Sequence, residues 1–289
     1  MIYHFKKALL TVGLIGCLFS SEVVAQKKLF PESPGIVSYT YRNQFDKDVL
    51  GTLDMIKGQG ITDIEFSSLF KQTPEDLRKM CDARGIKCSS YGVSYEDLVN
   101  KTDEVGRTAL TLGATYIRVA SIPHKGAFTL DNAKRTVSDF NKYGKLLKNN
   151  YGLTFIYHNH GFEFQPYNDG TLYDYLLKNT EPKYVSMELD ILWAFLPGQD
   201  PAQLLAKYGN RYSTLHMKDL RKGIERGSLS GGTAKDNDVI LGAGQIDIPA
   251  VIKAARKAGV KHYYIEDESS SSATQVPESI KYLNSLKKD

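Results

Sequence analysis

The chain is poor in cysteine and tryptophan, and it carries no marked excess of either charge. Three cysteines and one tryptophan in 289 residues exclude a disulfide-stapled fold. Cys81 and Cys88 fall on a predicted helix and the next predicted strand, so we expect two buried free thiols. The 37 basic and 33 acidic residues are interspersed and leave a formal net charge of +4. Because a nucleic-acid surface needs a massed basic face with stacked aromatics, no nucleic-acid partner is expected.

Long apolar runs are also missing, apart from a short one near the N-terminus. Residues 1–25 combine a basic start, the apolar run 8–19 and small residues before Ala25. This pattern is typical of a cleaved signal peptide, and the run is too short to span a bilayer. We expect cleavage after Ala25 and a periplasmic or otherwise exported protein. As an alternative, residues 14–17 resemble a lipobox, which would place a lipid anchor on Cys17.

The rest of the chain alternates between predicted strands and helices. Removing the signal leaves 289 minus 25, or 264 residues, close to the roughly 250 of an eightfold barrel. The predicted strands are 36–41, 61–66, 86–90, 116–120, 155–158, 185–190, 213–216 and 263–266, and the predicted helices are 46–57, 73–84, 100–112, 130–149, 171–179, 201–208, 248–258 and 277–286. Eight such units predict an α/β fold, a single (β/α)8 TIM barrel over residues 26–289. The Gly- and Ser-rich segment 220–247 is predicted to be a lid, because a loop of that length in a compact domain is usually functional.

Four predicted strands in the second half of the chain end in side chains that bind metals. These are His158, Asp190, His216 and Glu266. Since parallel strands of a barrel present their C-terminal ends at one mouth, the four side chains should converge there. A mixed nitrogen and oxygen shell suits one divalent ion, either Mn, Co, Mg or Zn. Without a cation, four buried ionisable groups would need strong partners.

The motifs at these strand ends resemble the sugar phosphate isomerase/epimerase family of xylose isomerase-like TIM barrels. The resemblance lies in Tyr157-His158-Asn159-His160-Gly161-Phe162-Glu163-Phe164, Glu188-Leu189-Asp190, Leu215-His216-Met217-Lys218-Asp219, Leu241-Gly242-Ala243-Gly244-Gln245-Ile246-Asp247 and Ile265-Glu266-Asp267. It implies one metal held by a Glu, Asp, His, Glu set, which carries over to Asp190, His216 and Glu266. His158 stands where many members have Glu, so either His158 or Glu163 is the fourth ligand.

Such a site favours removal of a proton next to a carbonyl of a sugar, with the cation stabilising the enediolate. The candidate catalytic bases are the carboxylates Glu163 and Glu266. Return of the proton makes the enzyme an isomerase or epimerase, whereas loss of an oxygen leaving group makes it a carbon-oxygen lyase acting on 3-keto-glycosides. Export favours a free sugar over a phosphorylated one. A sugar-binding protein without turnover is a third possibility, and a DNA-repair endonuclease would need more histidines than the chain offers.

Four further residues are candidates for substrate binding. Glu65 ends a predicted strand and either bonds a sugar hydroxyl or pairs with Arg118 or Lys87. His160 shares the inward face with His158 by the strand period of two. Trp193, the single tryptophan, forms either an apolar wall for a sugar ring or a helix contact. Lys218 either binds substrate oxygens or pairs with Asp219 or Glu266. The oligomeric state does not follow from the sequence.

Overall fold

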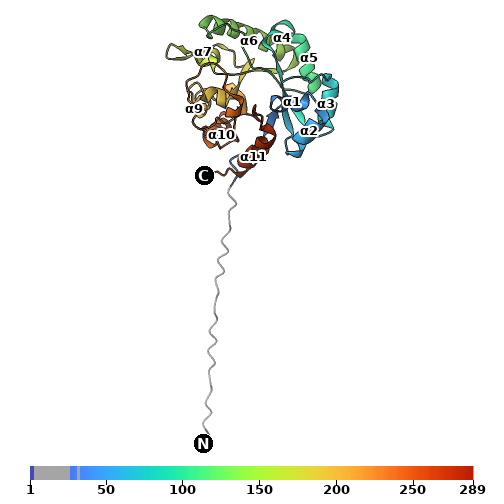
Figure 1. The fold of residues 1–289 in the computed structure, drawn as a ribbon, viewed down its shortest axis with the longest axis vertical. Helices are drawn as coiled ribbons and strands as arrows, with labels where there is room; N and C mark the ends of the chain where they lie inside the picture. Colours follow the sequence, from blue (N-terminus) through green and yellow to red (C-terminus); the bar gives the residue numbers. More distant parts are fainter. Residues whose placement is uncertain (3–26, 31–32, 289) are drawn as a thin grey trace.

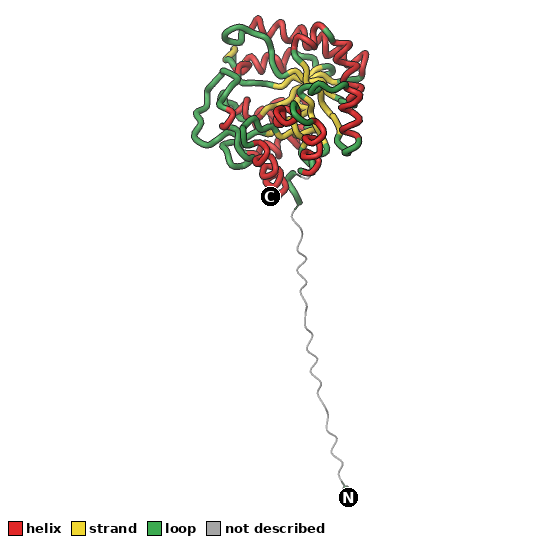
Figure 2. The backbone as a smooth tube through the Cα atoms, turned by 45° about the vertical axis from the view of Figure 1, so that its right-hand side comes forward, coloured by secondary structure: helices red, strands yellow, loops and turns green. Residues whose placement is uncertain are grey.

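Eight parallel strands close into a barrel that is surrounded by helices (Figures 1 and 2). The computed structural model describes residues 1–2, 27–30 and 33–288. Neighbouring strands follow the order β1-β10-β9-β8-β5-β4-β3-β2, and the last strand in this order pairs with the first. This confirms the predicted (β/α)8 TIM barrel. Almost all of the predicted signal, including Cys17, lies outside the described residues.

The barrel strands match the predicted ones closely in the second half of the chain, where their C-terminal ends fall within one residue of the prediction. They are β1 (Gly35–Val37), β2 (Asp63–Phe66), β3 (Lys87–Val93), β4 (Tyr116–Val119), β5 (Thr154–His158), β8 (Val185–Asp190), β9 (Tyr212–Met217) and β10 (His262–Ile265). The register places His158 beside Glu188 and Asp190 beside His216. A separate hairpin, β6 (Pro166–Tyr167) with β7 (Gly170–Thr171), follows β5.

The helices form the outer layer, and each of the eight predicted helices is present. The long ones are α2 (Val49–Gly58), α3 (Pro74–Asp82), α5 (Thr102–Leu112), α6 (Leu130–Tyr151), α7 (Leu172–Asn179), α9 (Pro201–Tyr208), α10 (Ile248–Ala258) and α11 (Ser272–Ser285). The residue predicted to cap the N-terminus of α3 forms the expected hydrogen bond. The Thr73 hydroxyl accepts a hydrogen bond from the Asp76 amide at 3.1 Å, a cap that stabilises a helix by about 1 kcal/mol.

Besides the hairpin β6–β7 and a short helix directly after β8, three parts of the fold differ from the prediction, and two of these differences shape the mouth of the barrel. The first strand ends at Val37, and Ser38–Tyr41 forms a 3-10 turn followed by α1 (Arg42–Phe45). The third strand continues to Val93 and leads into an unpredicted helix, α4 (Tyr95–Asn100). The third difference is α11, which begins at Ser272, before Pro277, because its first turn packs buried side chains such as Val276 against the barrel.

The core lies between the barrel wall and the helices. Outward-facing strand residues such as Ile64 and Phe155 are fully buried there, in contact with apolar faces of the helices. Cys81 and Cys88 are buried and free, as predicted. Among the described residues, no helix has the length and apolarity that a membrane crossing requires.

The segment from Leu220 to Asp247, called loop 220–247 below, has little regular structure, as predicted. It contains a single 3-10 turn (Lys235–Asn237) and, near its end, the residues Gly242 to Ile246 that return to the barrel. These residues are held by the Asp219 carboxylate, which accepts hydrogen bonds from the amides of Gly242, Gly244 and Ile246 at 2.9 to 3.0 Å. The base of the loop is therefore fixed to the end of β9.

A second short helix, α8 (Ile191–Phe195), starts directly after β8. Its first turn is capped by Asp190, whose Oδ1 accepts a hydrogen bond from the Trp193 amide at 2.8 Å. Asp190, a predicted metal ligand, thus has its Oδ1 held by the backbone, and this bond fixes the direction of its Oδ2.

Candidate functional site

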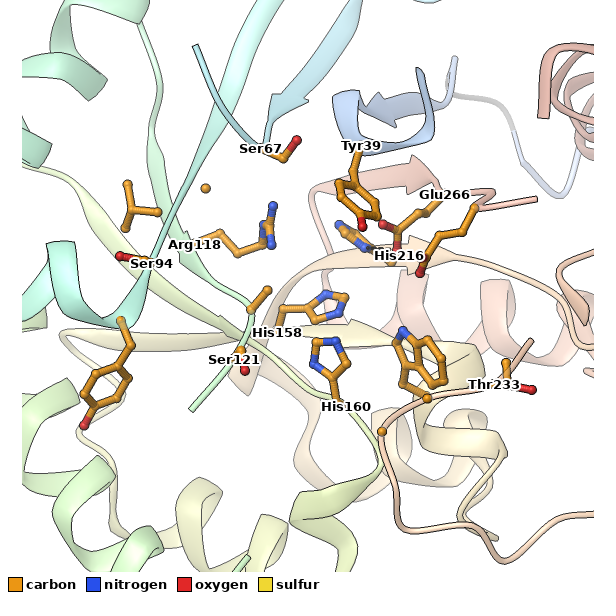
Figure 3. Close-up of a pocket in the computed structure, with 18 of the residues that line it drawn as sticks. Tyr39, Ser67, Ser94, Arg118, Ser121, His158, His160, His216, Thr233 and Glu266 are labelled. Carbon is orange, nitrogen blue, oxygen red and sulfur yellow. Dashed lines mark hydrogen bonds and ion pairs between the residues drawn. The ribbon is translucent and has the colours of Figure 1, made fainter. Parts of the chain in front are cut away.

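A pocket opens at the C-terminal ends of the barrel strands (Figure 3). Its volume of about 690 Å³ lies within the range of small-molecule sites. The polar and aromatic side chains that line it are Tyr39, Ser67, Ser94, Tyr95, Glu96, Arg118, Ser121, His158, His160, Trp193, His216, Thr233, Lys235, Asp238, Glu266 and Glu268. The pocket therefore joins the predicted strand-end residues to loop 220–247.

The four predicted metal ligands meet at the bottom of this pocket. Asp190 Oδ2 lies 3.9 Å from His158 Nε2 and 3.9 Å from His216 Nδ1. His216 Nδ1 lies 3.0 Å from Glu266 Oε2. All four side chains are buried, and they come from four neighbouring strands. The structure thus brings together residues that are 108 positions apart between the first and the last (266 minus 158).

The state of the Asp190 carboxylate fits a cation site. Its Oδ2 is buried and has no hydrogen-bond partner among the residues that the structure describes. Burial raises the pKa of Asp190 to about 8, although the nearby Lys218 ammonium acts to lower it. An ionised carboxylate oxygen in this position needs a positive partner, and imidazole and carboxylate donors are the ligands that Mn, Co and Zn accept. Two overlapping groups of three side chains have ligand atoms close enough together to hold such an ion: Asp190, His216 and Glu266, and His158, Glu188 and His216.

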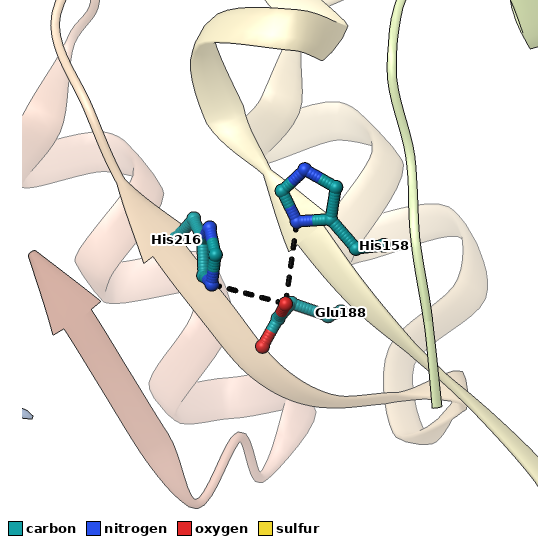
Figure 4. Close-up of side chains that lie close together, drawn as sticks. All are labelled: His158, Glu188 and His216. Carbon is teal, nitrogen blue, oxygen red and sulfur yellow. Dashed lines mark hydrogen bonds and ion pairs between the residues drawn. The ribbon is translucent and has the colours of Figure 1, made fainter. Parts of the chain in front are cut away.

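Glu188 orients the two imidazoles of this group (Figure 4). Its Oε1 lies 3.2 Å from His158 Nδ1 and 3.0 Å from His216 Nε2, while its Oε2 accepts a hydrogen bond from Thr214 at 2.7 Å. Because one nitrogen of each ring faces Glu188, the other nitrogen of each ring faces Asp190. This is the arrangement by which outer carboxylates fix histidine ligands in metal sites.

The protonation states differ sharply between the two histidines. Burial, together with the positive charges of His216 and Arg118, lowers the pKa of His158 well below its usual range. Burial acts in the same direction on His216, but the carboxylates of Glu188 and Glu266 overcome it and raise the pKa of His216 well above the usual range. Binding of a cation at His216 Nδ1 would therefore release a proton.

Glu65 does not line the pocket, contrary to the expectation that it binds substrate. It is fully buried on β2, and its Oε1 lies 2.6 Å from Arg118 Nε and 3.0 Å from His216 Nε2. The alternative of an ion pair with Arg118 is thus the one that forms. The pair lies beneath the ligand group, and Arg118 in turn reaches the pocket wall.

Glu163 also lies elsewhere than expected, which corrects its assignment as a base or a fourth ligand. It is fully buried on the 3-10 turn Phe162–Phe164, where it accepts hydrogen bonds from the Tyr157 hydroxyl and from the His160 amide. Since His158 faces inward, Tyr157 faces outward, and its ring packs 5.1 Å from that of Phe140 on α6. Glu163 therefore lies outside the barrel wall, and burial raises its pKa to about 7.

Three other predicted residues surround the ligand group. His160 and Trp193 line the pocket with their rings stacked 5.7 Å apart. The His160 Nδ1 atom is buried without a hydrogen-bond partner among the described residues, and burial holds the pKa of His160 well below its usual range. The ring is therefore neutral and offers substrate either a donor or an acceptor.

Lys218 lies beneath Trp193, with its Nζ 5.0 Å from the centre of the indole ring. Its ammonium contacts Glu266 Oε2 at 3.2 Å, Glu268 Oε1 at 2.8 Å and Asp238 Oδ2 at 3.6 Å. The predicted pairing with Glu266 is present, whereas Asp219 holds loop 220–247 instead. Burial would raise the pKa of Glu266, but Lys218 and His216 lower it well below its usual range, so Glu266 is ionised.

Sequence reasoning did not assign several residues of the site. Glu188 shares the inward face with Asp190 by the strand period of two, but no sequence pattern shows that it contacts both imidazoles. Asp238 and Glu268 lie in loops, where periodicity carries no information about direction. Tyr39 fell within a predicted strand, and the 3-10 turn that brings it into the pocket gives no periodic signal.

Comparison with known proteins places this site in a family. The xylose isomerase-like TIM barrel family matches residues 53–286, and the chain belongs to this family. Inosose dehydratase of Lacticaseibacillus casei is 24% identical over 253 residues, which cover 78% of this chain and 83% of that enzyme. Its relatives are thus named as enzymes that modify sugars.

Solved structures agree with this assignment. A sugar phosphate isomerase/epimerase from Parabacteroides distasonis superposes with a TM-score of 0.70 at 27% identity, covering 91% of this chain and 96% of the other. The IolI protein, solved with a binding zinc atom, superposes with the same TM-score at 14% identity, covering 88% of this chain and 95% of the other. The second likeness concerns the fold alone.

Proposed function

We propose that the protein is a divalent-metal-dependent enzyme that removes a proton next to the carbonyl of a keto-sugar and then expels an oxygen leaving group. The observation that carries this proposal is the buried Asp190 Oδ2, unpartnered among the described residues and flanked by His158, His216 and Glu266 at the bottom of a pocket. These residues would hold a divalent ion, which when bound would supply the polarisation of a carbonyl oxygen and the stabilisation of negative charge on it.

Glu266 is the residue that removes the proton. It belongs to the ligand group, and it is the carboxylate of that group that lines the pocket and is ionised, whereas Asp190 and Glu188 do not reach the pocket wall. The carbon-hydrogen bond breaks, its electron pair forms a carbon-carbon double bond, and the bond to the leaving oxygen breaks. The proton that Glu266 takes up is passed to the departing oxygen, which leaves as water or as an alcohol.

Two observations favour elimination over epimerisation. Epimerisation requires a second acid-base group on the opposite face of the substrate, and Glu163, the candidate for that role, lies outside the barrel wall. The curated relatives are inosose dehydratases, which supports a lyase. Isomerisation or epimerisation is the second candidate function, because the Parabacteroides distasonis structure at 27% identity is named a sugar phosphate isomerase/epimerase.

The charge of the pocket favours a neutral substrate. Its lining carboxylates, Glu96, Asp238, Glu266 and Glu268, outnumber its cations, Arg118 and Lys235. With a divalent ion bound, these charges come close to balance, and Arg118 is already paired with Glu65 at 2.6 Å, so the lining offers no cluster of unpaired cations for a phosphate group. A free keto-sugar or 3-keto-glycoside also agrees with the proposed export of the protein through residues 1–25.

Product analysis in deuterated water tests the proposal. The protein is incubated with Mn, Co, Mg or Zn and a panel of free sugars, keto-sugars and 3-keto-glycosides, and the products are followed by NMR and mass spectrometry. Elimination releases water or an alcohol, whereas isomerisation or epimerisation conserves mass and introduces deuterium at one carbon. Asp190→Asn should abolish either reaction. Absence of both exchange and cleavage with every cation, alongside tight sugar binding, would instead indicate a binding protein.

A further inference from the structure

A second cavity adjoins the pocket. This neighbour has a volume of about 380 Å³ and shares two lining residues, Lys235 and Glu268, with the first. Its other polar groups are the cations Arg42 and Lys47 and a set of hydroxyls and amides, including those of Thr40, Asn43, Gln44 and Ser269. A wall of this kind offers paired donors and acceptors, which is the chemistry that the hydroxyls of a sugar require.

An aromatic side chain lies at the junction of the two cavities. Tyr39 lines the first cavity and is 37% exposed, which makes it one of the few large apolar side chains open to solvent among the described residues. The ring points into the pocket beside His216 and Glu266 (Figure 3). Aromatic rings bind ligands largely through their faces, and an exposed ring at the edge of a polar pocket is poised for such contact.

Arg42 holds this ring in place. Its guanidinium carbon lies 4.2 Å from the centre of the Tyr39 ring, and its two terminal nitrogens donate hydrogen bonds to the carbonyl oxygens of Tyr39 at 2.7 Å and Glu268 at 3.4 Å. Arg42 itself lines the second cavity. The ring is thus immobilised before any ligand arrives, which lowers the entropy cost of binding to it.

The combined space exceeds what one sugar ring fills. At the volume of liquid water, the first cavity alone would hold roughly twenty waters, about twice the number of non-hydrogen atoms in a single hexose. If one ring occupies the ligand group at the bottom, the space beside Tyr39 and in the second cavity is left for another. The ring that bears the carbonyl and the second ring attached to it would then lie on opposite sides of Glu266 and Glu268.

We propose that Tyr39 and Arg42 form a subsite for a second sugar ring, so that the substrate is a glycoside of at least two rings. This assignment deepens the proposed function, on which it rests in one respect: the second ring is the leaving group of the elimination. Tyr39 contacts that ring by its face, and the hydroxyls and amides of the second cavity bond its edges. The affinity for two-ring ligands should therefore depend on Tyr39, whereas the affinity for one ring should not.

Binding of unreactive sugars tests the subsite without any turnover. The metal-loaded protein is titrated with glucose and with cellobiose, maltose, sophorose and trehalose, and the dissociation constants are measured by ligand-observed NMR. We expect at least one disaccharide to bind about fivefold or more tightly than glucose. Tyr39→Ala should weaken that disaccharide by about five- to tenfold and leave glucose unchanged, and Tyr39→Phe should retain the preference.

Tyr184 provides a matched control. Its ring also carries a cation on one face, with Lys183 Nζ 5.3 Å from the centre, but it precedes β8 at the opposite end of the barrel. Tyr184→Ala should leave every sugar affinity unchanged. The subsite is overturned if no disaccharide binds more tightly than glucose, or if Tyr39→Ala weakens glucose and disaccharide equally.

The outcomes separate this inference from the proposed function. A Tyr39-dependent disaccharide preference without any elimination would keep the subsite and defeat the lyase. Elimination with equal kcat/KM for a methyl 3-keto-glycoside and a 3-keto-disaccharide would keep the lyase and defeat the subsite.

Discussion

Glu188 decides how two histidines face a cation. Its carboxylate contacts one ring nitrogen of His158 and one ring nitrogen of His216. The side chain is fully buried and does not line the pocket. A carboxylate in this position fixes ring orientation and increases the basicity of the nitrogen that binds the metal. The chemistry of the site therefore depends on a side chain that never meets substrate.

Replacing this carboxylate should weaken metal binding. Glu188→Gln is expected to reduce the affinity for Mn or Zn by about 10- to 100-fold, because the rings lose the group that orients them. Calorimetric titration of the metal measures the change. Glu181→Gln, at an exposed position before β8, is the control and should bind normally. Unchanged affinity in Glu188→Gln would show that the rings are oriented by other contacts.

The buried carboxyl group of Glu163 should make the stability of the fold depend on pH. Burial raises its pKa from 4.5 to about 7, so ionisation costs more in the folded than in the unfolded chain. The stability contributed by the protonated form is complete below pH 4.5 and is lost as the pH rises through 7. The full shift corresponds to about 3 kcal/mol in the free energy of unfolding, of which most should be lost between pH 5 and 8.

Urea unfolding at pH 5 and pH 8 measures this effect. Glu163→Gln cannot ionise, so the difference in stability between the wild type and this variant should change by about 2 kcal/mol between the two pH values, with the wild type losing more at pH 8. Parallel pH dependences of the two proteins would mean that Glu163 titrates near its ordinary value.

At the scale of elements, the attachment of loop 220–247 to the end of β9 shapes the pocket. The loop contributes Thr233, Lys235 and Asp238 to the wall, and Asp238 contacts Lys218. The loop is attached through the Asp219 carboxylate at the end of β9, and the backbone of Gly244 passes close to this carboxylate. A Cβ atom at position 244 would lie 2.2 Å from Asp219 Oδ1 and 2.4 Å from the Leu220 carbonyl oxygen.

A methyl group at this point should therefore disturb the whole loop. Gly244→Ala is expected to lower the free energy of unfolding by about 1–3 kcal/mol, because the added methyl group would clash with the Leu220 carbonyl oxygen, a backbone atom that cannot move without shifting the chain. Hydrogen exchange should show faster exchange across loop 220–247. Gly232→Ala is the matched control in the same loop, because a Cβ there meets nothing within 4 Å. Equal stability of the two variants would contradict this account.

At the scale of the whole molecule, a cation at the barrel mouth would link four strands that come from distant parts of the sequence. Because only the folded chain assembles this group, metal binding should add directly to stability. At a metal concentration about 100 times the dissociation constant, the free energy of unfolding should rise by about 2.7 kcal/mol. Thermal unfolding with Mn or Zn and then with excess chelator measures the difference. Asp190→Asn should show little dependence on metal, and a metal-dependent shift of equal size in this variant would place the ion elsewhere.

The sequence was informative about everything that follows a regular period. The alternation of strands and helices, the Thr73 cap and the ends of strands at His158, Asp190 and Glu266 depend on local patterns, and the structure has them where they were predicted. Glu163 and Tyr39 show the opposite case. Each lies in a 3-10 turn that follows a strand, where the direction of a side chain depends on what packs against it rather than on a period.

The sequence by itself therefore determined the barrel and the mouth at which the metal-binding side chains gather, because burial of apolar strands and helix faces leaves a pattern in the order of residues. Only the tertiary structure decided which carboxylates meet the imidazoles, with Glu188 and Glu266 inside and Glu163 outside the wall. It also decided that Tyr39 and loop 220–247 line the same pocket as the strand ends. These arrangements depend on contacts between segments far apart in the chain, and such contacts leave no periodic signal in the sequence.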